Sequence, residues 1–187
     1  MKNNKNNQSK KVQNKILSVI NDYSRAWMIL KKYDDERLTL PKKGVRAKHL
    51  LNYDGAQKAI SLLKKELAKK EKVPDIFGVE RSKKFLEGVI KNVYQTYGKK
   101  ELYPTLAEKA AHLFYFVVKD HPFIDGNKRL GAFLFIVFLA QNNYLLKKNG
   151  EQKINDNALV ALTVFLAQSE PKEKDVLIKL IANFLSP

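Results

Sequence analysis

The chain has 187 residues, no cysteine, and a formal net charge of +16, with 35 Lys and Arg residues against 19 Asp and Glu residues. This length is enough for one domain with a sizeable core, and the lack of cysteine excludes disulfide bonds and thiolate metal sites. No apolar run is long enough to cross a bilayer, because the longest candidate, Leu130–Leu139, has only the length of a buried core helix. We therefore expect no membrane partner.

The excess of lysine is spread along the whole chain rather than gathered in one stripe. Nucleic-acid-binding proteins usually carry clustered basic residues within a recognised binding module. Here Lys64, Lys65 and Lys69 recur at helical spacing beside leucines, which is typical of a solvated helix face. Dedicated nucleic-acid binding is therefore not expected, although the charge favours attraction to acidic targets.

The N-terminal part of the chain predicts a tail followed by a helix. Residues 1–11 are rich in Asn and Lys and lack the apolar core of a signal peptide, so we expect a disordered tail or a linker. A single domain would then occupy residues 12–187. The stretch Val12–Lys31 predicts its first helix, whose apolar residues recur with the helical period and are expected in the core: Ile16, Val19, Ile20, Tyr23, Trp27 and Leu30. The polar stretch Asp34–Val45, which contains a proline and a glycine, predicts a loop.

Helical patterns continue through the middle of the chain. Asp54 can cap a helix over Gln57–Lys70, which a proline and a glycine then terminate. The apolar spacing predicts a further helix over Ser82–Tyr97. The segment Lys99–Tyr103 could form a small β-hairpin.

Two buried helices are predicted around the most informative stretch of the chain. Thr105 and Glu108 have the spacing of a capping box, which opens the helix that contains Ala107–Val118. This helix should end near Asp120, because His121 precedes a proline and is biased away from the helical conformation. Another helix should begin at Asn127.

The C-terminal part predicts the helices Asn157–Gln168 and Lys172–Phe184. No strand pattern is strong, so we predict an all-α fold, a bundle of about seven helices with room for one hairpin near residues 99–103.

The stretch between the two buried helices has the composition of a phosphate-handling loop. It reads His121, Pro122, Phe123, Ile124, Asp125, Gly126, Asn127, Lys128 and Arg129. Loop amides and a helix N-terminus that point into one cavity make an anion site. Arg129 can bind phosphate oxygens with two nitrogens at once, and Lys128 adds a point charge.

Two further residues of the loop suit chemistry on phosphate. Asp125 would be poorly placed beside a bare phosphate, but it fits Mg²⁺, which takes one or two carboxylates together with phosphate oxygens. His121 is the only side chain of the loop that can accept a proton near neutral pH. Taken singly, these residues have plainer interpretations: His121 would be a loop residue, Asp125 to Asn127 an ordinary turn, and Phe123 a core residue that pins the loop.

At every specified position these nine residues resemble the signature H-x-F-x-(D/E)-(G/A)-N-(G/K)-R of the Fic/Doc family. The resemblance extends to Tyr103–Ala111 and to Gly131–Phe135, and it is closest to the Fic domain of RhuM-like virulence proteins. It implies the Fic helical fold, with a target-docking flap near residues 99–103. It also implies a transferase that uses a nucleoside triphosphate such as ATP, together with Mg²⁺, to modify a hydroxyl group of a Ser, Thr or Tyr residue on a target protein. A bacterial cytoplasmic location is expected, and a secreted effector remains an alternative.

The resemblance also assigns roles to residues of the loop. His121 would take the proton from the target hydroxyl, and Asp125 would hold Mg²⁺. Gly126 and Asn127 would form the anion nest, while Arg129 would bind and neutralise the phosphates during transfer. Pro122 and Phe123 would be structural.

The type of reaction depends on two positions that disagree. Lys128 is similar to the lysine of death-on-curing toxins, which transfer the terminal phosphate, whereas enzymes that transfer AMP usually have glycine there. Gly126 instead resembles the enzymes that transfer AMP. Phosphotransfer, as in a toxin, is the favoured hypothesis; AMP or UMP transfer is the alternative, and a catalytically inactive basic adaptor is a second alternative. We find no inhibitory pattern (S/T)-x-x-x-E-(G/N), so an antitoxin or a missing N-terminal domain would supply any restraint.

Overall fold

The computed structural model describes the backbone of residues 2–186 and the side chains of residues 13–20 and 23–186. The chain forms two compact units, Met1–Thr39 and Leu40–Pro187. The first unit is built on one long helix, α1 (Lys2–Asp34). Its sequence contains no glycine or proline to interrupt a helix, since the first proline is Pro41.

Helix α1 differs from the sequence prediction in two respects. Residues 2–11 are helical, although the sequence predicts a disordered tail or linker there, and the first compact unit extends to Thr39. Within this unit no second helix covers the apolar stripe, so Trp27, expected in a core, is 49% exposed. A linker role for residues 1–11 stays a prediction.

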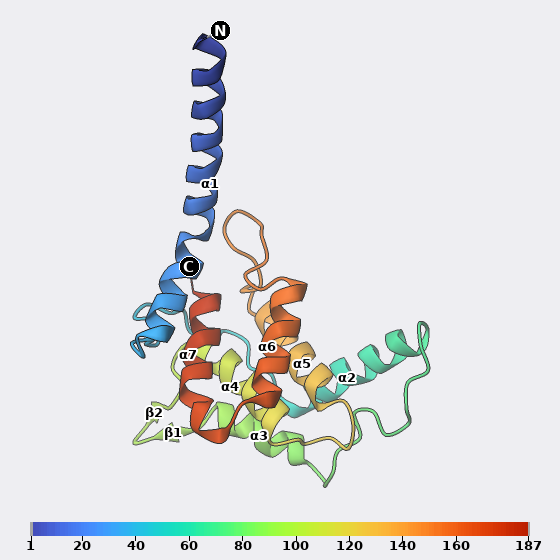
Figure 1. Ribbon diagram of the computed structural model, residues 1–187. Coiled ribbons are helices and arrows are strands. Elements are labelled where there is room, and N and C mark those ends of the chain that lie inside the picture. Colours follow the sequence, from blue (N-terminus) through green and yellow to red (C-terminus); the bar gives the residue numbers. More distant parts are fainter. Residues whose placement is uncertain (1, 187) are drawn as a thin grey trace. The chain divides into compact units, whose positions relative to one another are not determined.

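The second unit is organised around helix α4 (Leu106–Lys119). Every side chain from Leu106 to Val118 is buried, so the helix has no solvent face. The neighbours of α4 in Figure 1 are α3 (Phe85–Val93), α5 (Asn127–Gln141), α6 (Asp156–Gln168) and α7 (Lys174–Leu185). A 3₁₀ turn, Pro171–Glu173, precedes α7. Gly131 lets α5 approach α4 closely, because a β-carbon there would lie 2.7 Å from Val118 Cγ2.

The helix boundaries at α4 follow the predicted capping chemistry. Thr105 Oγ1 accepts a hydrogen bond from the Glu108 amide, and the Glu108 carboxylate accepts one from the Thr105 amide, which completes the capping box. Asp120 closes the helix, as expected.

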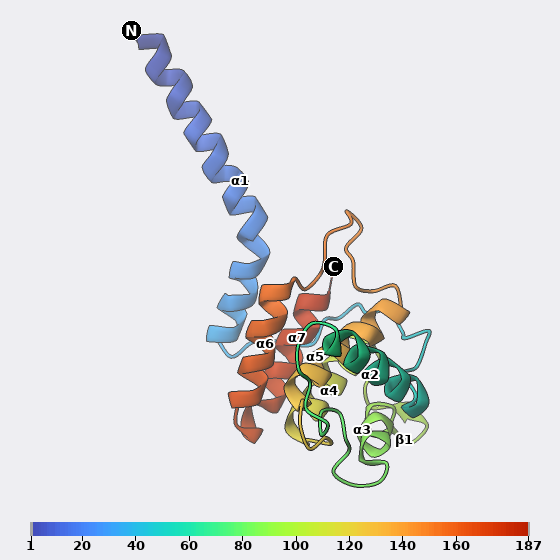
Figure 2. The ribbon, with the colours of Figure 1, turned by 90° about the vertical axis from the view of Figure 1, so that its right-hand side faces the viewer.

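Helix α2 (Tyr53–Ala68) packs against α3 and α5, as the view in Figure 2 shows. Its cap differs from the prediction. The side chain of Asn52, not Asp54, accepts the amide hydrogen bond of Gly55, at 2.8 Å. Asn52 is the last extended residue before the helix, so its side chain can reach the free amides, whereas Asp54 already lies in the first turn.

Helix α3 is shorter than the predicted Ser82–Tyr97. The residues on either side of it belong to other structures, which pair with the loop before the helix and form a hairpin after it. At the C-terminal side, β1 (Thr96–Tyr97) and β2 (Lys100–Glu101) form the small antiparallel hairpin, with Thr96 opposite Glu101. Gly98 and Lys99 turn the chain with φ of +53° and +66°. Lys109 of α4 holds the hairpin: its buried ammonium lies 3.2 Å from the Glu101 carboxylate and donates to the Tyr103 carbonyl.

The prediction of an all-α fold of about seven helices with a small hairpin is therefore confirmed within the described residues. None of the described helices combines the length and the apolar character needed to span a membrane.

His112 should make the stability of the second unit depend on pH. It lies buried in α4, stacks on Tyr103 with 3.5 Å between ring centroids, and has Nδ1 2.9 Å from the Glu108 carbonyl oxygen. Burial, assisted by the charge of Lys174, lowers its pKa from 6.5 to about 4. As the pH falls below 6.5 the unfolded chain binds a proton that the folded chain refuses, so stability falls until the pH reaches about 4.

We expect His112 to account for a loss of about 3 kcal/mol in the free energy of unfolding between pH 7 and pH 4. Urea unfolding at a series of pH values, on the wild type and on His112→Gln, measures this contribution as the difference between the two pH profiles. Parallel profiles would contradict the buried, neutral imidazole.

Candidate active site

The loop between α4 and α5 borders an open pocket of about 400 Å³. The pocket is lined by Arg81, His121, Ile124, Asp125, Gly126, Asn127, Lys128 and Arg129. The residues that the sequence assigns to proton transfer, metal binding and phosphate binding therefore lie around one cavity. The two residues assigned a structural role, Pro122 and Phe123, are buried beside it.

Asn127 holds the loop closed through its side chain. Its Oδ1 accepts a hydrogen bond from the Phe123 amide, and its Nδ2 donates to the Phe123 carbonyl, both at 2.8 Å. The Phe123 ring is completely buried in the core. The predicted anion nest would therefore use the backbone of Asn127, because both polar atoms of its side chain bond to Phe123.

A distant segment, residues 77–81, pairs with the loop through an antiparallel bridge between Glu80 and Phe123 and a parallel bridge between Phe77 and Asp125. Gly78 N donates to Asp125 O at 3.1 Å, and Ile124 N donates to Val79 O at 2.8 Å. Arg81 N donates to Pro122 O at 2.9 Å. This pairing explains why α3 begins only at Phe85: the residues before it support the loop.

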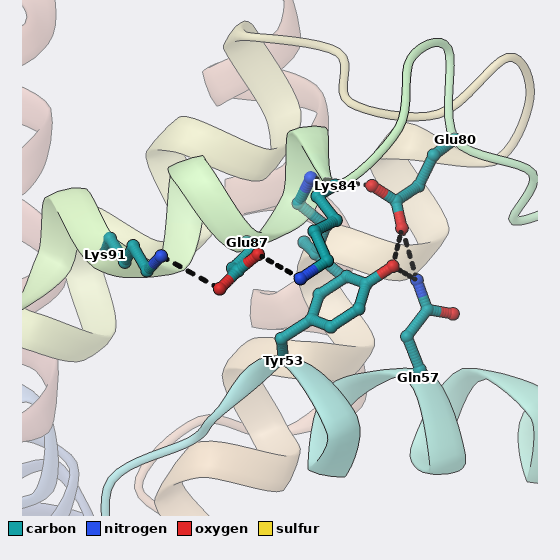
Figure 3. Close-up of polar contacts among 7 residues, drawn as sticks. Tyr53, Gln57, Glu80, Lys84, Glu87 and Lys91 are labelled. Carbon is teal, nitrogen blue, oxygen red and sulfur yellow. Dashed lines mark hydrogen bonds and ion pairs between the residues drawn. The ribbon is translucent and has the colours of Figure 1, made fainter.

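Glu80 anchors the supporting segment to two helices. Figure 3 shows its carboxylate facing Tyr53 and Gln57 of α2, with distances of 2.6 Å to the Tyr53 hydroxyl and 2.5 Å to Gln57 Nε2. Its other oxygen accepts the Leu86 amide of α3 at 3.0 Å. The hydrogen bond to Glu80 raises the pKa of Tyr53, so the phenol stays protonated and acts as the donor.

Phe77, at the start of the supporting segment, requires glycine at position 126. Gly126 has a φ of +91°, which side chains rarely tolerate. A β-carbon at this position would lie 2.4 Å from Phe77 Cε2 and 2.6 Å from Cδ2. The buried Phe77 ring therefore accounts for this glycine independently of any ligand.

Cations outnumber carboxylates around the pocket. Arg129 lies between Asp125, at 3.3 Å, and Glu71, at 3.9 Å, and its guanidinium carbon is 4.4 Å from the centroid of the Phe77 ring. In the part of the chain that the structure describes, Lys128 and Arg81 form no ion pair within 4 Å. Among the described residues that line the pocket, Asp125 is thus the one carboxylate, and it lies with the three basic residues Arg81, Lys128 and Arg129.

The N-terminus of α5 adds backbone donors to this positive field. The helix begins at Asn127, and its cap residue Gly126 has no side chain to bond the first amides. The first amides of a helix have no partner within it, and the helix dipole favours an anion beside them. Amides and cations together make the pocket suitable for phosphate groups.

His121 lies exposed at the rim of the pocket and has a strained backbone. Its φ of +50° is in the left-handed region, which costs a residue with a β-carbon about 1–3 kcal/mol. The neighbouring Asp120 is partly desolvated; burial raises its pKa, and the charges of Lys174 and His121 oppose this shift. The strained conformation places the imidazole at the pocket.

The donor set around the pocket suits Mg²⁺ better than a metal that needs a full protein shell. Asp125 is a half-buried carboxylate at the pocket wall, and Mg²⁺ often takes one or two carboxylates together with phosphate oxygens and water. Among the residues described, no cluster of three His, Asp or Glu side chains could hold a metal alone. Asp125 contacts Arg129 through Oδ2, at 3.3 Å, and a carboxylate has a second oxygen that could hold the ion.

Arg81 and the supporting segment could not be recognised from the sequence. Arg81 lies forty residues before His121 in an irregular stretch, and neither periodicity nor a local motif marks it. None of the residues of the hairpin, where a docking flap was expected, lines the pocket; the segment beside the loop is instead residues 77–81. A docking role for the hairpin stays a prediction.

The fold and the pocket define a helical protein with a basic pocket at the loop between two core helices. Residues 51–139 match the model of the Fic/DOC family. The matched segment runs from the N-cap region of α2 to α5 and contains every residue that lines the pocket. The match supports the Fic/Doc resemblance of the loop. Neither the search of curated proteins nor the search of solved structures found a match.

Gly126→Ala should destabilise the protein by about 2–4 kcal/mol, because it adds backbone strain and an overlap with Phe77. Gly150→Ala is the matched control, since Gly150 has a similar φ of +85° and open space around its β-carbon position. It should cost only about 1 kcal/mol. Urea unfolding of both variants gives the two free energies.

The same measurement in a Phe77→Leu background tests the cause. Removing the ring should reduce the cost of Gly126→Ala by about 1 kcal/mol or more, because the two positions are in contact. Additive effects would show that the strain comes from the backbone alone.

Proposed function

We propose that this protein is a Fic/Doc-type transferase that modifies a hydroxyl group on a target protein, using ATP or another nucleoside triphosphate and Mg²⁺. Members of this family are typically protein-modifying transferases, and residues 51–139 match its model. The observation that carries the proposal is the pocket itself. It gathers three cations, one carboxylate and the uncapped start of α5 around His121.

The favoured reaction is transfer of the terminal phosphate. The target hydroxyl oxygen forms a bond to the γ-phosphorus, and the bond from that phosphorus to the β,γ-bridging oxygen breaks, so that the nucleoside diphosphate leaves. His121 accepts the proton of the hydroxyl. Mg²⁺, held by Asp125, would neutralise charge on the phosphates. Lys128, Arg129 and the first amides of α5 would bind the polyphosphate chain, neutralise its charge and so orient the terminal phosphate.

Two structural observations favour phosphotransfer over nucleotide transfer. Lys128 lines the pocket, so its side chain fills space that glycine would leave for further phosphates. Gly126, which argued for AMP transfer, is accounted for by its contact with Phe77 and so no longer indicates the reaction type. The two positions therefore no longer point to different reactions.

We also propose the wider setting that the resemblance implies. The protein would act on a Ser, Thr or Tyr hydroxyl as a toxin of the bacterial cytoplasm, restrained by an antitoxin or by a further domain. The segments Tyr103–Ala111 and Gly131–Phe135 support a relation to RhuM-like proteins.

ATP labelled at either the α or the γ position, incubated with protein, Mg²⁺ and cell lysate, tests the function. We expect label on a target protein from γ-labelled ATP only. His121→Ala should lower this labelling about 10²–10⁴-fold, because it removes the general base. His49→Ala is the control, since His49 is exposed and does not line the pocket, and it should label like the wild type.

Label from α-labelled ATP would establish AMP transfer instead. No labelling from either position, with ATP bound, would favour the inactive adaptor. Full activity of His121→Ala would refute its role as the base.

Lys128 should determine the reaction type. Lys128→Gly should permit some AMP transfer, because it opens space for the β and γ phosphates beside α5. Lys128→Met keeps most of the volume and removes the charge, so it should lose phosphotransfer without gaining AMP transfer. Mass spectrometry of the modified target distinguishes the two adducts. Equal AMP transfer by both variants would show that charge, not space, decides.

A further inference from the structure

Arg81 joins the pocket from outside the family motif, and its guanidinium is fixed at one edge. Its Nε donates to the Phe123 carbonyl at 3.0 Å, while its backbone amide donates to Pro122 O at 2.9 Å. The Phe123 carbonyl can accept this bond and that of Asn127 together, since a carbonyl oxygen has two lone pairs. The backbone and the guanidinium of Arg81 are therefore both hydrogen-bonded to the two residues that follow His121.

The terminal nitrogens of Arg81 are left for another partner. Within the residues that the structure describes, neither Nη atom forms a hydrogen bond or an ion pair with the protein. Arg129 differs, because Asp125 and Glu71 already lie beside its guanidinium. A guanidinium held through Nε presents its remaining donors as a fork that matches phosphate oxygens.

The backbone of Arg81 is held before any ligand arrives. The adjacent Glu80 ties the segment to α2 through Tyr53 and Gln57, as Figure 3 shows. It also ties the segment to α3, because its second carboxylate oxygen accepts the Leu86 amide hydrogen bond. Because Arg81 is already held in place, it would lose little conformational entropy when it binds a ligand. Its contact would therefore add more to the affinity than the same contact from a freely moving arginine.

We propose that Arg81 binds the terminal phosphate of the polyphosphate chain in this pocket. The assignment to a terminal phosphate rests on the proposed function, in which the γ-phosphate lies toward His121. The backbone amide of Arg81 bonds to Pro122, the neighbour of His121, so we place Arg81 at the His121 end of the pocket. Lys128 and the first amides of α5 would then bind the phosphates at the other end. Arg81 is thus a specificity residue for triphosphate over diphosphate.

Binding titrations test this without any transfer step. The probes are the β,γ-imido analogue of ATP, ADP and inorganic triphosphate, each with Mg²⁺, measured by calorimetry on the full chain. Arg81→Gln should weaken the triphosphate analogue and inorganic triphosphate about 10- to 100-fold, as expected for a lost charge-assisted hydrogen bond. It should weaken ADP less than about threefold.

Two further variants separate binding from support of the loop. Lys83→Gln removes a charge from an exposed neighbour that does not line the pocket, and it should leave all three affinities unchanged. Arg81→Lys keeps the charge but loses the Nε donor, so its affinity for triphosphate should lie between those of the wild type and Arg81→Gln.

Each result of these titrations either supports or overturns the assignment of Arg81 to the terminal phosphate. An equal loss for triphosphate and ADP, or unchanged triphosphate binding, overturns the assignment and leaves the proposed function standing. Arg81-dependent binding of inorganic triphosphate without binding of the ATP analogue supports the site and overturns the nucleotide-dependent function. If the wild type binds none of the probes, both proposals fail.

Discussion

The backbone pairing between residues 77–81 and the loop after α4 is the contact on which the geometry of the pocket depends. A loop that joins two buried helices cannot fix its own backbone over so many residues. Here the backbones of Gly78, Val79 and Arg81 bond the loop from one side, and the Asn127 side chain bonds it from the other. The loop polar groups are thus satisfied largely by protein, and the first amides of α5, which have no partner within the helix, belong to residues that line the pocket.

The elements that local chemistry controls could be predicted from the sequence. Thr105 and Glu108 cap α4, Asp120 ends it, and Asn127 starts α5, because each depends on residues within one helical turn. The errors occur where partners are distant in sequence. The choice of Asn52 over Asp54 as a cap, the late start of α3 and the position of Arg81 all follow from tertiary contacts that no periodicity encodes. The loop could be recognised, but its support could not.

The role of a motif position can change once its packing is known. Gly126 and Lys128 lie close together in the same signature and both line the pocket, but only the β-carbon position of Gly126 is blocked by the buried Phe77 ring. Glycine at position 126 is therefore explained by the ring of Phe77, a residue nearly fifty positions upstream. For lysine at position 128 we propose a role in binding the ligand. Positions 77 and 126 form a pair that is expected to change together among relatives, since the larger residue at one limits the other.

Helix α4 has a consequence for how the site could be controlled. Because its side chains are enclosed on every face up to Val118, its C-terminal end cannot shift without disturbing the core of the whole unit. The loop that follows α4 therefore starts from a fixed helix end, and the hydrogen bonds of the Asn127 side chain to Phe123 fix it a second time. We therefore expect the backbone around this pocket to be rigid, so that a regulator would act by occluding the mouth of the pocket rather than by reshaping its walls.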